Sequence, residues 1–364
     1  METKKKFGFI VHCRNLRELR LVAARYRLSP FSLLPAQMLK SHLLKKGYVN
    51  DIFTFRNVVS DRQIVCQGKA FCLLMTPEQM LENQNLTTEL VKQGCRMAAD
   101  WGAEMVGLGA ICAVVGARGV EAAESCSAAV TTGNSLTAYA AFVQFEKIMA
   151  RLGEDPARHK IVMVGFPGSI TLVLTKMLYE KGLNLVLVSR RKTAFLKKFL
   201  DGIDGGEGRV EITQDMGEAL KQGRIVFSAT SSGDIISQND LLPGSIVFDI
   251  AQPKDVVFQQ VPRQDVLIVD AGLISLPRAT TDQYRYSGWQ ANDIPSCLGE
   301  TITLTLEQRW ENYSLGRELV IEKIRQIGGL SEKHGFVFDK FRTFTRPITD
   351  VHFEIAGKAL RSAA

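Results

Sequence analysis

The sequence lacks any apolar run that approaches the ~18 residues of a membrane-spanning helix. The apolar stretch near the N-terminus, Phe7 to Val11, is five residues long and ends at His12, whereas the hydrophobic part of a signal peptide needs about 7–15. Internal repeats and low-complexity segments are also absent. We therefore expect a cytoplasmic protein without a membrane anchor.

Patterns typical of metal sites and of disulfide frameworks are missing too. The number of cysteines, seven, is odd, no pair has C-x-x-C spacing, and the five histidines show no metal spacing. We predict no metal ion. All cysteines except Cys297 lie in mainly apolar or small-residue segments and are expected to be small buried hydrophobic residues. These six are Cys13, Cys66, Cys72, Cys95, Cys112 and Cys126.

The composition is that of an ordinary globular protein. The 364 residues suffice for two or three domains of ~150 residues. The fractions of hydrophobic residues, 46%, and of charged residues, 23%, exclude a disordered chain, a collagen and a disulfide-rich miniprotein. The net charge of +7 is compatible with an acidic protein partner, nucleic acid or a membrane surface, and selects none of them.

The hydrophobic pattern predicts an α/β fold in two successive parts. In the first part, strands and helices alternate. They are strand 6–12, helix 15–26, strand 63–75, helix 77–101, strand 104–108, strand 128–132 and helix 134–152. The segment GEDPARHK then acts as a linker.

Short apolar strands that alternate with helices follow, and predict a doubly wound parallel sheet. The strands are 160–164, 184–189, 224–229, 245–250 and 265–270, with helices 169–181 and 192–200. Residues 296–334 are predicted as two long helices with a break near Ser314 to Gly316. We expect an N-terminal α/β substrate domain (1–152), a dinucleotide-binding domain (153–290) and a C-terminal helical segment (291–364).

A glycine turn follows the predicted strand 160–164. Its pattern, Gly165-x-x-Gly168-x-x-Thr171, allows a pyrophosphate to approach the start of the next helix. Threonine at the third position makes the motif imperfect, and a turn without a ligand is the alternative. The strand–turn–helix–strand order favours a dinucleotide site. We assign to it Gly165, Phe166, Gly168, Ser169 and Ile170, and also Ala229, Thr230 and Ser231 at the end of strand 224–229.

The end of the second strand of this series favours NADPH over NADH. An NAD site usually has Asp or Glu here, on the ribose 2′-hydroxyl. This chain has Ser189-Arg190-Arg191-Lys192 instead, and guanidinium groups bind a 2′-phosphate through paired hydrogen bonds. The alternative is a solvated basic helix start, which the helix dipole disfavours.

Cys297 is a candidate nucleophile. It lies in Asp293-Ile-Pro-Ser-Cys-Leu-Gly-Glu300, and Pro295 and Ser296 are typical of a helix start. In the first turn the helix dipole would lower the thiol pKa and favour the reactive thiolate. The alternative is a packed cysteine without chemistry.

Small residues at two strand–helix junctions are candidates for substrate binding, because they let a ligand approach backbone N–H groups. One junction is Leu108-Gly109-Ala110 and the other is Thr131-Thr132-Gly133-Asn134. A turn followed by a helix N-cap is the alternative. The candidate substrate-binding residues are Gly109, Ala110, Thr132, Gly133 and Asn134. His334 is expected to interact with the end of a helix rather than to donate a proton.

Several of these motifs together resemble the aldehyde-forming long-chain acyl-[acyl-carrier-protein] reductases, best known from cyanobacteria. The resemblance covers roughly residues 6 to 336 and is specific in TTGN-x-x-TAY (131–139) and in the segment from Cys297 to Trp310. Further matches are 7–12, 108–109, 314–317 and 333–336. The glycine turn departs from the family's G-x-T-G-x-I-G at Phe166, Pro167 and Thr171.

The resemblance implies an N-terminal substrate domain, a central Rossmann domain for NADPH and C-terminal helices that close the cleft, with Cys297 as nucleophile. Residues 337–364 extend past the family's usual end and have no assigned role. The implied substrate is a fatty acyl thioester on acyl carrier protein or coenzyme A, reduced to an aldehyde through an acyl-cysteine. Peripheral membrane contact is compatible with such a product, and no nucleic-acid partner is expected.

An acidic acyl carrier protein would suit the basic N-terminal segment. The first 27 residues hold eight Lys or Arg and two Glu, and Arg14, Arg17, Arg20 and Arg25 are candidates for docking. A solvated helix face is the alternative explanation.

Three other functions compete with acyl reduction. One is a shikimate-dehydrogenase-like oxidoreductase of a small hydroxy or keto acid, which needs no nucleophilic cysteine. Another is a glutamyl-tRNA reductase-like enzyme, whose cysteine lies in the N-terminal domain, where Cys13 has no comparable context. The third is an NADP-binding redox sensor without catalysis.

Overall fold

The computed structural model describes residues 5–25, 33–191, 196, 202–203, 208–276 and 292–362. Most of the predicted helix 192–200 lies outside these residues. The chain divides into two compact units. Unit 1 comprises Met1–Leu136, Leu276–Arg317 and Gln326–Phe336, and unit 2 comprises Thr137–Ser275, Glu318–Arg325 and Val337–Ala364. The three-domain division stays a prediction.

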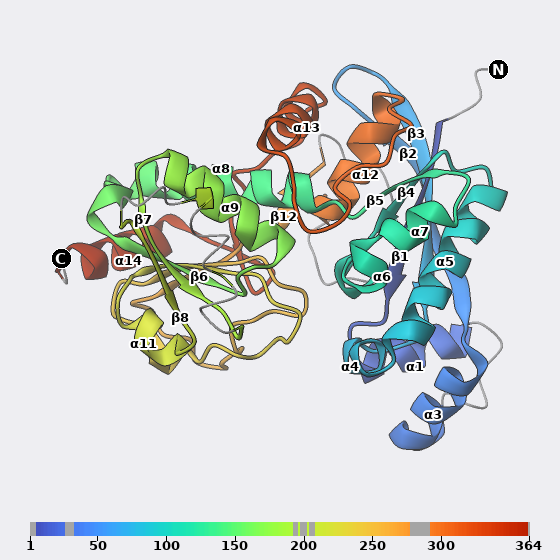
Figure 1. Ribbon diagram of the computed structural model, residues 1–364, viewed down its shortest axis with the longest axis horizontal. Coiled ribbons are helices and arrows are strands. Elements are labelled where there is room, and N and C mark those ends of the chain that lie inside the picture. Colours follow the sequence, from blue (N-terminus) through green and yellow to red (C-terminus); the bar gives the residue numbers. More distant parts are fainter. Residues whose placement is uncertain are drawn as a thin grey trace. The chain divides into compact units, whose positions relative to one another are not determined.

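Unit 1 contains a five-stranded sheet in the order β2-β3-β1-β4-β5 (Figure 1). β3, β1, β4 and β5 are parallel, and β2 pairs antiparallel with β3 at the edge. The bounds are β1 Lys5–His12, β2 Val49–Val59, β3 Val65–Leu73, β4 Met105–Leu108 and β5 Ala129–Thr131. Parallel strands bring their carboxyl ends to one edge, so the turns after β1, β4 and β5 are neighbours.

Helices cover both faces of this sheet. Side chains alternate along a strand, so Ile10 on β1 points to Gly94 of α5, while Phe9 points to the opposite face. On that opposite face α12 packs against β4, where a Cβ on Gly107 would lie 1.9 Å from Thr301 Oγ1. Glycine at this position therefore lets α12 approach the sheet closely.

In unit 1 one predicted helix is wrong and two elements were not predicted. The predicted helix from Pro77 to Trp101 is interrupted at Asn83, and α3 and β2 were not predicted. The helices are α1 Leu16–Arg25, α3 Ala36–Lys46, α4 Pro77–Glu82, α5 Gln84–Asp100, α6 Val115–Arg118, α7 Val120–Glu124 and α12 Ser296–Leu306. The long helices α8 (Asn134–Leu152) and α13 (Ile321–Lys333) each contribute residues to both units.

Unit 2 contains a six-stranded parallel sheet in the order β11-β10-β9-β6-β7-β8. The strands are β6 Lys160–Val164, β7 Asn184–Val188, β8 Val210–Thr213, β9 Ile225–Ser228, β10 Ile246–Asp249 and β11 Leu267–Asp270. Numbered within the unit, this order is 6-5-4-1-2-3, which defines the doubly wound Rossmann arrangement. The predicted α/β fold class is confirmed.

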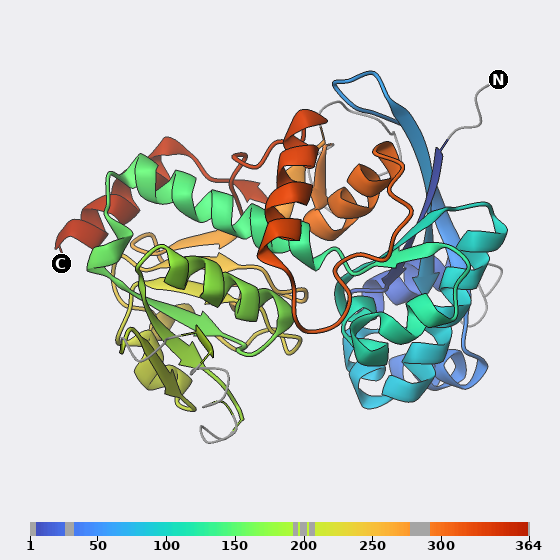
Figure 2. The same cartoon turned by 45° about the horizontal axis from the view of Figure 1, so that its top comes forward.

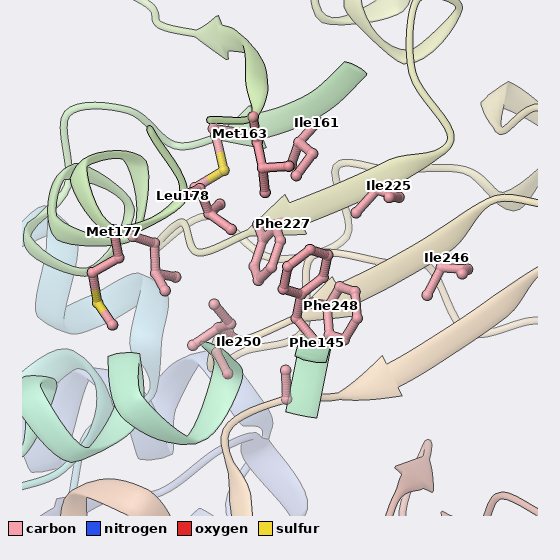
Figure 3. Packing of buried hydrophobic residues seen from close by; sticks show 14 of the residues in the cluster. Phe145, Ile161, Met163, Met177, Leu178, Ile225, Phe227, Ile246, Phe248 and Ile250 are labelled. Atoms are coloured by element: carbon pink, nitrogen blue, oxygen red, sulfur yellow. The ribbon is translucent and has the colours of Figure 1, made fainter. Parts of the chain in front are cut away.

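The core of unit 2 forms on both faces of this sheet. Ile161, Phe227 and Phe248 face α8 and α9 (Ser169–Glu180), and the valines that alternate with them face α11 (Met216–Leu220). Figure 3 shows Phe145 of α8 against Phe227 and Phe248, with ring centroids 5.5 and 5.8 Å away. Such ring pairs contribute about 0.5–1.5 kcal/mol each beyond the burial of their area.

The C-terminal segment, which had no assigned role, is part of the unit 2 core. It forms β14 (Arg342–Thr343), β15 (Arg346–Pro347) and α14 (Asp350–Ser362), and Figure 2 shows α14 near α8. Phe353 and Leu360 are buried, and Arg361 Nη1 donates to Leu152 O at 3.1 Å. Among the described residues, no helix combines the length and apolar character needed to cross a membrane.

Candidate active site

Cys297 lies in the first turn of α12, as the sequence predicts. The short strand β13 (Asp293–Pro295) precedes the helix, and Pro295 is its N-cap residue in an extended conformation. The cysteine side chain is partly exposed, whereas Ser296 and Leu298 on either side of it are buried. The fold therefore presents the sulfur of Cys297 at a helix start.

Both predicted substrate-binding junctions contribute a residue that lies beside Cys297. Gly133 has φ 74° and lies so close that a Cβ would be 2.2 Å from the Cys297 Cα. The backbone N–H groups of Ala110 and Leu298 hydrogen bond to the sulfur. Ala110, which follows Gly109 after β4, has φ 49°, a left-handed conformation unusual for a residue with a Cβ. Two of the five candidates, Ala110 and Gly133, thus lie beside Cys297, whereas Gly109 packs against Phe9 and the Ile10 carbonyl.

The other two candidates have structural partners. The Thr132 hydroxyl is buried and donates to the carbonyl oxygen of Ser314. Asn134 is half-buried and is the first residue of α8. A contact of either residue with substrate stays a prediction.

The expected lowering of the Cys297 pKa is wrong. Burial raises the pKa of this thiol to about 12, although the hydrogen bonds from Ala110 and Leu298 lower it. The nearby Glu300 carboxylate raises the pKa further. Loss of hydration of the thiolate outweighs the favourable helix start, so the resting sulfur is a protonated thiol at neutral pH.

This pKa predicts how Cys297 reacts with iodoacetamide. Only the thiolate is nucleophilic, and its fraction rises about tenfold per pH unit below the pKa. We therefore expect the alkylation rate of Cys297 to climb without a plateau from pH 7 to pH 10. Peptide mapping by mass spectrometry after timed labelling measures this rate.

Cys126 supplies an internal reference for that measurement. It is partly exposed, unlike the other five cysteines expected to be buried. A hydrogen bond from the Cys95 thiol, supported by the Ala128 backbone, lowers the Cys126 pKa to about 7. Its labelling rate should level off above about pH 8. A plateau for Cys297 in the same range would contradict the raised pKa.

His12, at the carboxyl end of β1, borders the same loop. Its side chain is buried, and burial lowers its pKa. Nδ1 lies 3.0 Å from Cys13 O and Nε2 lies 3.4 Å from the Ile111 backbone nitrogen, so Nδ1 carries the proton and Nε2 accepts. His12 thus supports the loop that carries Ala110. No role was predicted for His12, although it ends a strand as Leu108 and Thr131 do.

Glu300 is a second residue that sequence reasoning missed. It is fully buried, one helical turn beyond Cys297 on α12. Its carboxylate accepts hydrogen bonds from Thr131, Ser314 and the Leu136 backbone N–H. Burial raises its pKa, and these hydrogen bonds lower it. Only the spacing of three residues from Cys297 could have drawn attention to it.

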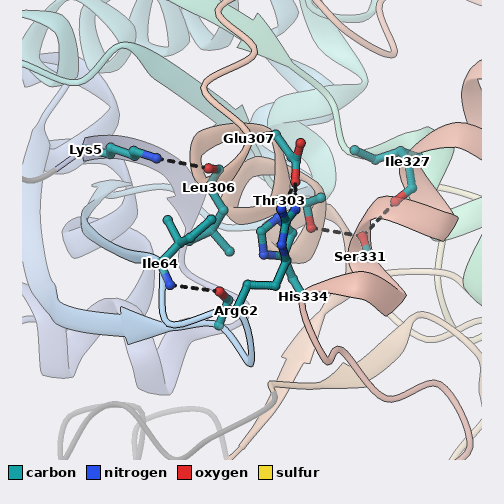
Figure 4. A network of polar contacts seen from close by, with 10 residues as sticks. Lys5, Arg62, Ile64, Thr303, Leu306, Glu307, Ile327, Ser331 and His334 are labelled. Carbon is teal, nitrogen blue, oxygen red and sulfur yellow. Dashed lines mark hydrogen bonds and ion pairs between the residues drawn. The ribbon is translucent and has the colours of Figure 1, made fainter.

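The opposite end of α12 is held by a separate polar network (Figure 4). Lys5 Nζ donates to Leu306 O at 3.2 Å, and Glu307 pairs with His334 at 2.7 Å and with Arg62 at 3.1 Å. His334 is buried directly after α13, where its contact with Glu307 gives it a structural role. The helix that carries Cys297 is therefore fixed at both ends within unit 1.

In unit 2, the glycine turn has the geometry of a dinucleotide-binding turn. Gly165 has φ 96°, and a Cβ on it would lie 2.7 Å from Ala229 O. Gly168 is the N-cap residue of α9 and has no side chain that could cap the helix. Thr171, at the imperfect third position, donates to Gly165 O at 3.1 Å and so stabilises the turn.

Phe166, Ser169 and Ile170 have less access to a ligand than the glycines. The Phe166 side chain is buried in the core, and its backbone N–H donates to Val188 O at 3.2 Å. Ser169 is buried and Ile170 half-buried. Their contact with a cofactor stays a prediction.

The remaining cofactor candidates lie at the carboxyl ends of the strands that flank β6. After β7, Ser189 is buried and Arg190 and Arg191 are exposed, with Arg190 Nη2 3.1 Å from Ser232 Oγ. After β9, the turn formed by Ala229, Thr230 and Ser231 is held by buried Asp255, which accepts from the Thr230 N–H at 2.9 Å. All predicted cofactor residues thus lie at one sheet edge, where doubly wound sheets bind ligands.

Comparisons with known proteins agree with an oxidoreductase-type fold. Residues 147–273 match the model of the family Shikimate / quinate 5-dehydrogenase, which covers β6 to β11 of unit 2. Over 213 residues the chain is 27% identical to the long-chain acyl-[acyl-carrier-protein] reductase of Synechococcus elongatus, covering 57% of this chain and 61% of that protein.

Other relatives bear different names. Over 339 residues the chain is 32% identical to an aminotransferase, PigE, of a Serratia species, covering 91% of this chain and 39% of that protein. The glutamyl-tRNA reductase of Acaryochloris marina is 24% identical over 110 residues, covering 28% of this chain and 25% of that protein. The chain spans less than two thirds of the length of each of these relatives.

Among solved structures, L-tryptophan dehydrogenase from Nostoc punctiforme aligns with 99% of this chain and 89% of its own. The sequence identity is 10% and the TM-score 0.43. This likeness is too loose to support an inference about function.

Proposed function

We propose that this protein is an NADPH-dependent reductase that converts a long-chain fatty acyl thioester, on acyl carrier protein or coenzyme A, to the fatty aldehyde. The observation that carries the proposal is the Cys297 thiol at the start of α12, with the Ala110 and Leu298 N–H groups hydrogen bonded to its sulfur. The 27% identity to an acyl-[acyl-carrier-protein] reductase supports the substrate class.

In the proposed reaction, the Cys297 sulfur attacks the thioester carbonyl carbon. A new C–S bond forms, the bond to the carrier sulfur breaks, and the carrier thiol takes up the proton that Cys297 loses. The backbone N–H groups at Ala110 and Leu298 would turn from the sulfur to the oxyanion of the tetrahedral intermediate and stabilise it. The product of this step is an acyl-cysteine.

The second half-reaction reduces that acyl group. Bound NADPH would supply a hydride to the carbonyl carbon. The resulting hemithioacetal breaks its C–S bond, which releases the aldehyde and restores the Cys297 sulfur as thiolate. The glycine turn at Gly165 and Gly168 would hold the pyrophosphate, and Arg190 and Arg191 the 2′-phosphate.

Substitution of Arg190 or Arg191 should weaken the binding of NADPH but not the binding of NADH. A charge-assisted hydrogen bond contributes about 1.5–3 kcal/mol, so Arg190→Ala and Arg191→Ala should each weaken NADPH binding about 10- to 100-fold. NADH binding should stay unchanged. Arg224→Ala is the matched control, because Arg224 precedes β9 at the opposite end of the strands. Comparable wild-type affinity for NADPH and NADH in a fluorescence titration would refute the 2′-phosphate assignment.

An acidic acyl carrier protein fits the outer face of α1. Arg17 is exposed there beside Leu21, which is 55% exposed, whereas Arg14 pairs with Glu18. We expect Arg17→Glu with Arg20→Glu to raise KM for acyl-carrier protein and to flatten its salt dependence, with KM for acyl-CoA unchanged. Lys221→Glu in unit 2 is the control. An unaltered salt dependence would contradict docking on α1.

A dehydrogenase acting on a small hydroxy or keto acid is the second candidate. The match of residues 147–273 to the shikimate/quinate dehydrogenase family favours it. Such an enzyme would not use Cys297, so its turnover would survive alkylation of that residue. A glutamyl-tRNA reductase-like activity would instead depend on RNA.

An aldehyde product is also a substrate for the type of reaction after which one relative is named. Transamination converts an aldehyde to an amine, and the 32% identical relative is named an aminotransferase. An aldehyde-forming activity in this chain would supply substrate to that class of reaction.

The direct test of the proposed function is product formation. Purified protein is incubated with NADPH and a long-chain acyl-carrier protein or acyl-CoA, and the organic extract is examined by gas chromatography. Aldehyde together with equimolar NADPH oxidation is the expected result. NADPH oxidation only with hydroxy or keto acids would favour the second candidate.

A further inference from the structure

We infer that Glu300 is a positioning residue that holds the segment Thr131–Leu136 against the turn carrying Cys297. The role of Glu300 in acyl transfer rests on the proposed function, whereas its restraint of the segment Thr131–Leu136 does not. Within the described part of the chain, the Glu300 carboxylate hydrogen bonds to Thr131, Leu136 and Ser314 and not to the Cys297 sulfur, so Glu300 acts on placement and not on the chemistry.

The carboxylate of Glu300 joins both ends of the segment Thr131–Leu136 to Ser314. Oε2 accepts from the Leu136 backbone N–H at 2.7 Å, in the first turn of α8. Oε1 accepts from the Thr131 hydroxyl at the end of β5. Ser314 Oγ lies 2.7 Å from the same Oε1 and 2.7 Å from Ser135 Oγ. Its single proton goes to the carboxylate, which is the stronger acceptor.

These contacts place a carboxylate at the N-terminus of another helix. The first N–H groups of a helix have no partner within it, and a negative charge there is favourable. Glu300 therefore caps α8 from α12. Since Glu300 is fully buried, solvent cannot replace it, and its removal leaves the Leu136 N–H and two hydroxyl groups without their acceptor.

Gly133 links the contacts of Glu300 to the position of Cys297. This residue lies midway between Thr131 and Leu136, and its backbone touches the Cys297 Cα closely enough to exclude a Cβ. When the two ends of the segment are held by Glu300, Gly133 is pressed against Cys297. The strained Ser314, with φ 54°, is fixed on the same carboxylate. The position of the nucleophile is thus coupled to the restraint by Glu300.

A substitution series separates restraint from charge. Glu300→Ala removes every acceptor. Glu300→Gln keeps one oxygen for the Leu136 N–H, and its amide donates to the Thr131 and Ser314 hydroxyls, which can rotate. Glu300→Asp keeps the charge but is one methylene too short to reach all three partners. Glu307→Ala is the matched control, because it removes a carboxylate from the far end of the same helix.

The first readout is amide hydrogen exchange of the peptide covering residues 131–137, followed by mass spectrometry. We expect faster exchange in Glu300→Ala and Glu300→Asp, and wild-type exchange in Glu300→Gln and Glu307→Ala. Unchanged exchange in both Glu300→Ala and Glu300→Asp would overturn the inference. If Glu300→Ala does not fold, the exchange rate in Glu300→Asp alone tests the inference. This readout needs no substrate, so it holds whether or not the proposed function fails.

The second readout is aldehyde formation. A displacement of reacting groups by about 1 Å lowers rates about 100-fold, so we expect kcat to fall by about that factor in Glu300→Ala, with KM for NADPH unchanged. Glu300→Gln should restore kcat to within a few-fold of the wild type. Equal losses in Glu300→Gln and Glu300→Ala would show that the charge, and not the restraint, matters. Absence of aldehyde from the wild type would refute the proposed function alone.

Discussion

Cys297→Ala should abolish aldehyde formation while NADPH binding stays at the wild-type level. Removal of a nucleophile that forms a covalent intermediate lowers kcat by ~10⁴-fold or more. The proposed cofactor-binding residues lie in unit 2, and Cys297 lies in unit 1. The measurement is steady-state aldehyde production beside a fluorescence titration with NADPH.

Two control variants sharpen this prediction. Cys297→Ser keeps the size of the side chain but is a far weaker nucleophile, so it should be nearly as inactive as the alanine variant. Cys126→Ser removes the cysteine whose pKa is lowest among the shifted thiols and should keep full activity. Substantial turnover by Cys297→Ala would refute covalent catalysis at this residue.

Gly133→Ala should have the second largest effect. The residue has φ 74°, and the new Cβ would lie 2.2 Å from the Cys297 Cα and 2.3 Å from its Cβ. A left-handed conformation costs about 1–2 kcal/mol for a residue with a Cβ, and overpacking about 1–3 kcal/mol more. We expect the free energy of unfolding to fall by about 2–5 kcal/mol and kcat by about 100-fold, because Cys297 must shift.

Gly182→Ala is the control for the effect of backbone conformation alone. Gly182 has φ 82°, similar to that of Gly133, but among the described residues beyond its chain neighbours no atom lies within 4 Å of its ideal Cβ position. It should lose about 1–2 kcal/mol of stability without loss of kcat per folded molecule. Denaturant unfolding and the aldehyde assay measure both effects. Equal kcat values for the two variants would show that Gly133 does not position Cys297.

The sequence predicted the parts of the fold that depend on local pattern. Strand β6, the turn from Gly165 to Gly168 and helix α9 follow each other as expected, because apolar alternation and glycine act within a few residues. The start of α8 at Asn134 was also predicted. By contrast, β2 and the C-terminal α14 were missed, since their place depends on pairing and packing with distant segments.

The candidate site was predictable in position but not in electrostatics. Cys297 and Gly133 are 164 residues apart, and their contact depends on α12 packing against the sheet. The helix start suggested a low thiol pKa, but burial reverses the shift. Glu300 was missed because a buried glutamate on an apolar helix face becomes meaningful only when its partners on Thr131 and Leu136 are known.

In the proposed function, Cys297 carries the acyl group between the two half-reactions. Intact-mass spectrometry tests it directly, with the protein mixed with a long-chain acyl-carrier protein, or with acyl-CoA, before and after addition of NADPH. We expect a mass increase of one acyl group, mapped to Cys297, that disappears on NADPH addition as aldehyde forms. An unmodified Cys297 with both thioesters, in protein that binds NADPH, would contradict this role of Cys297.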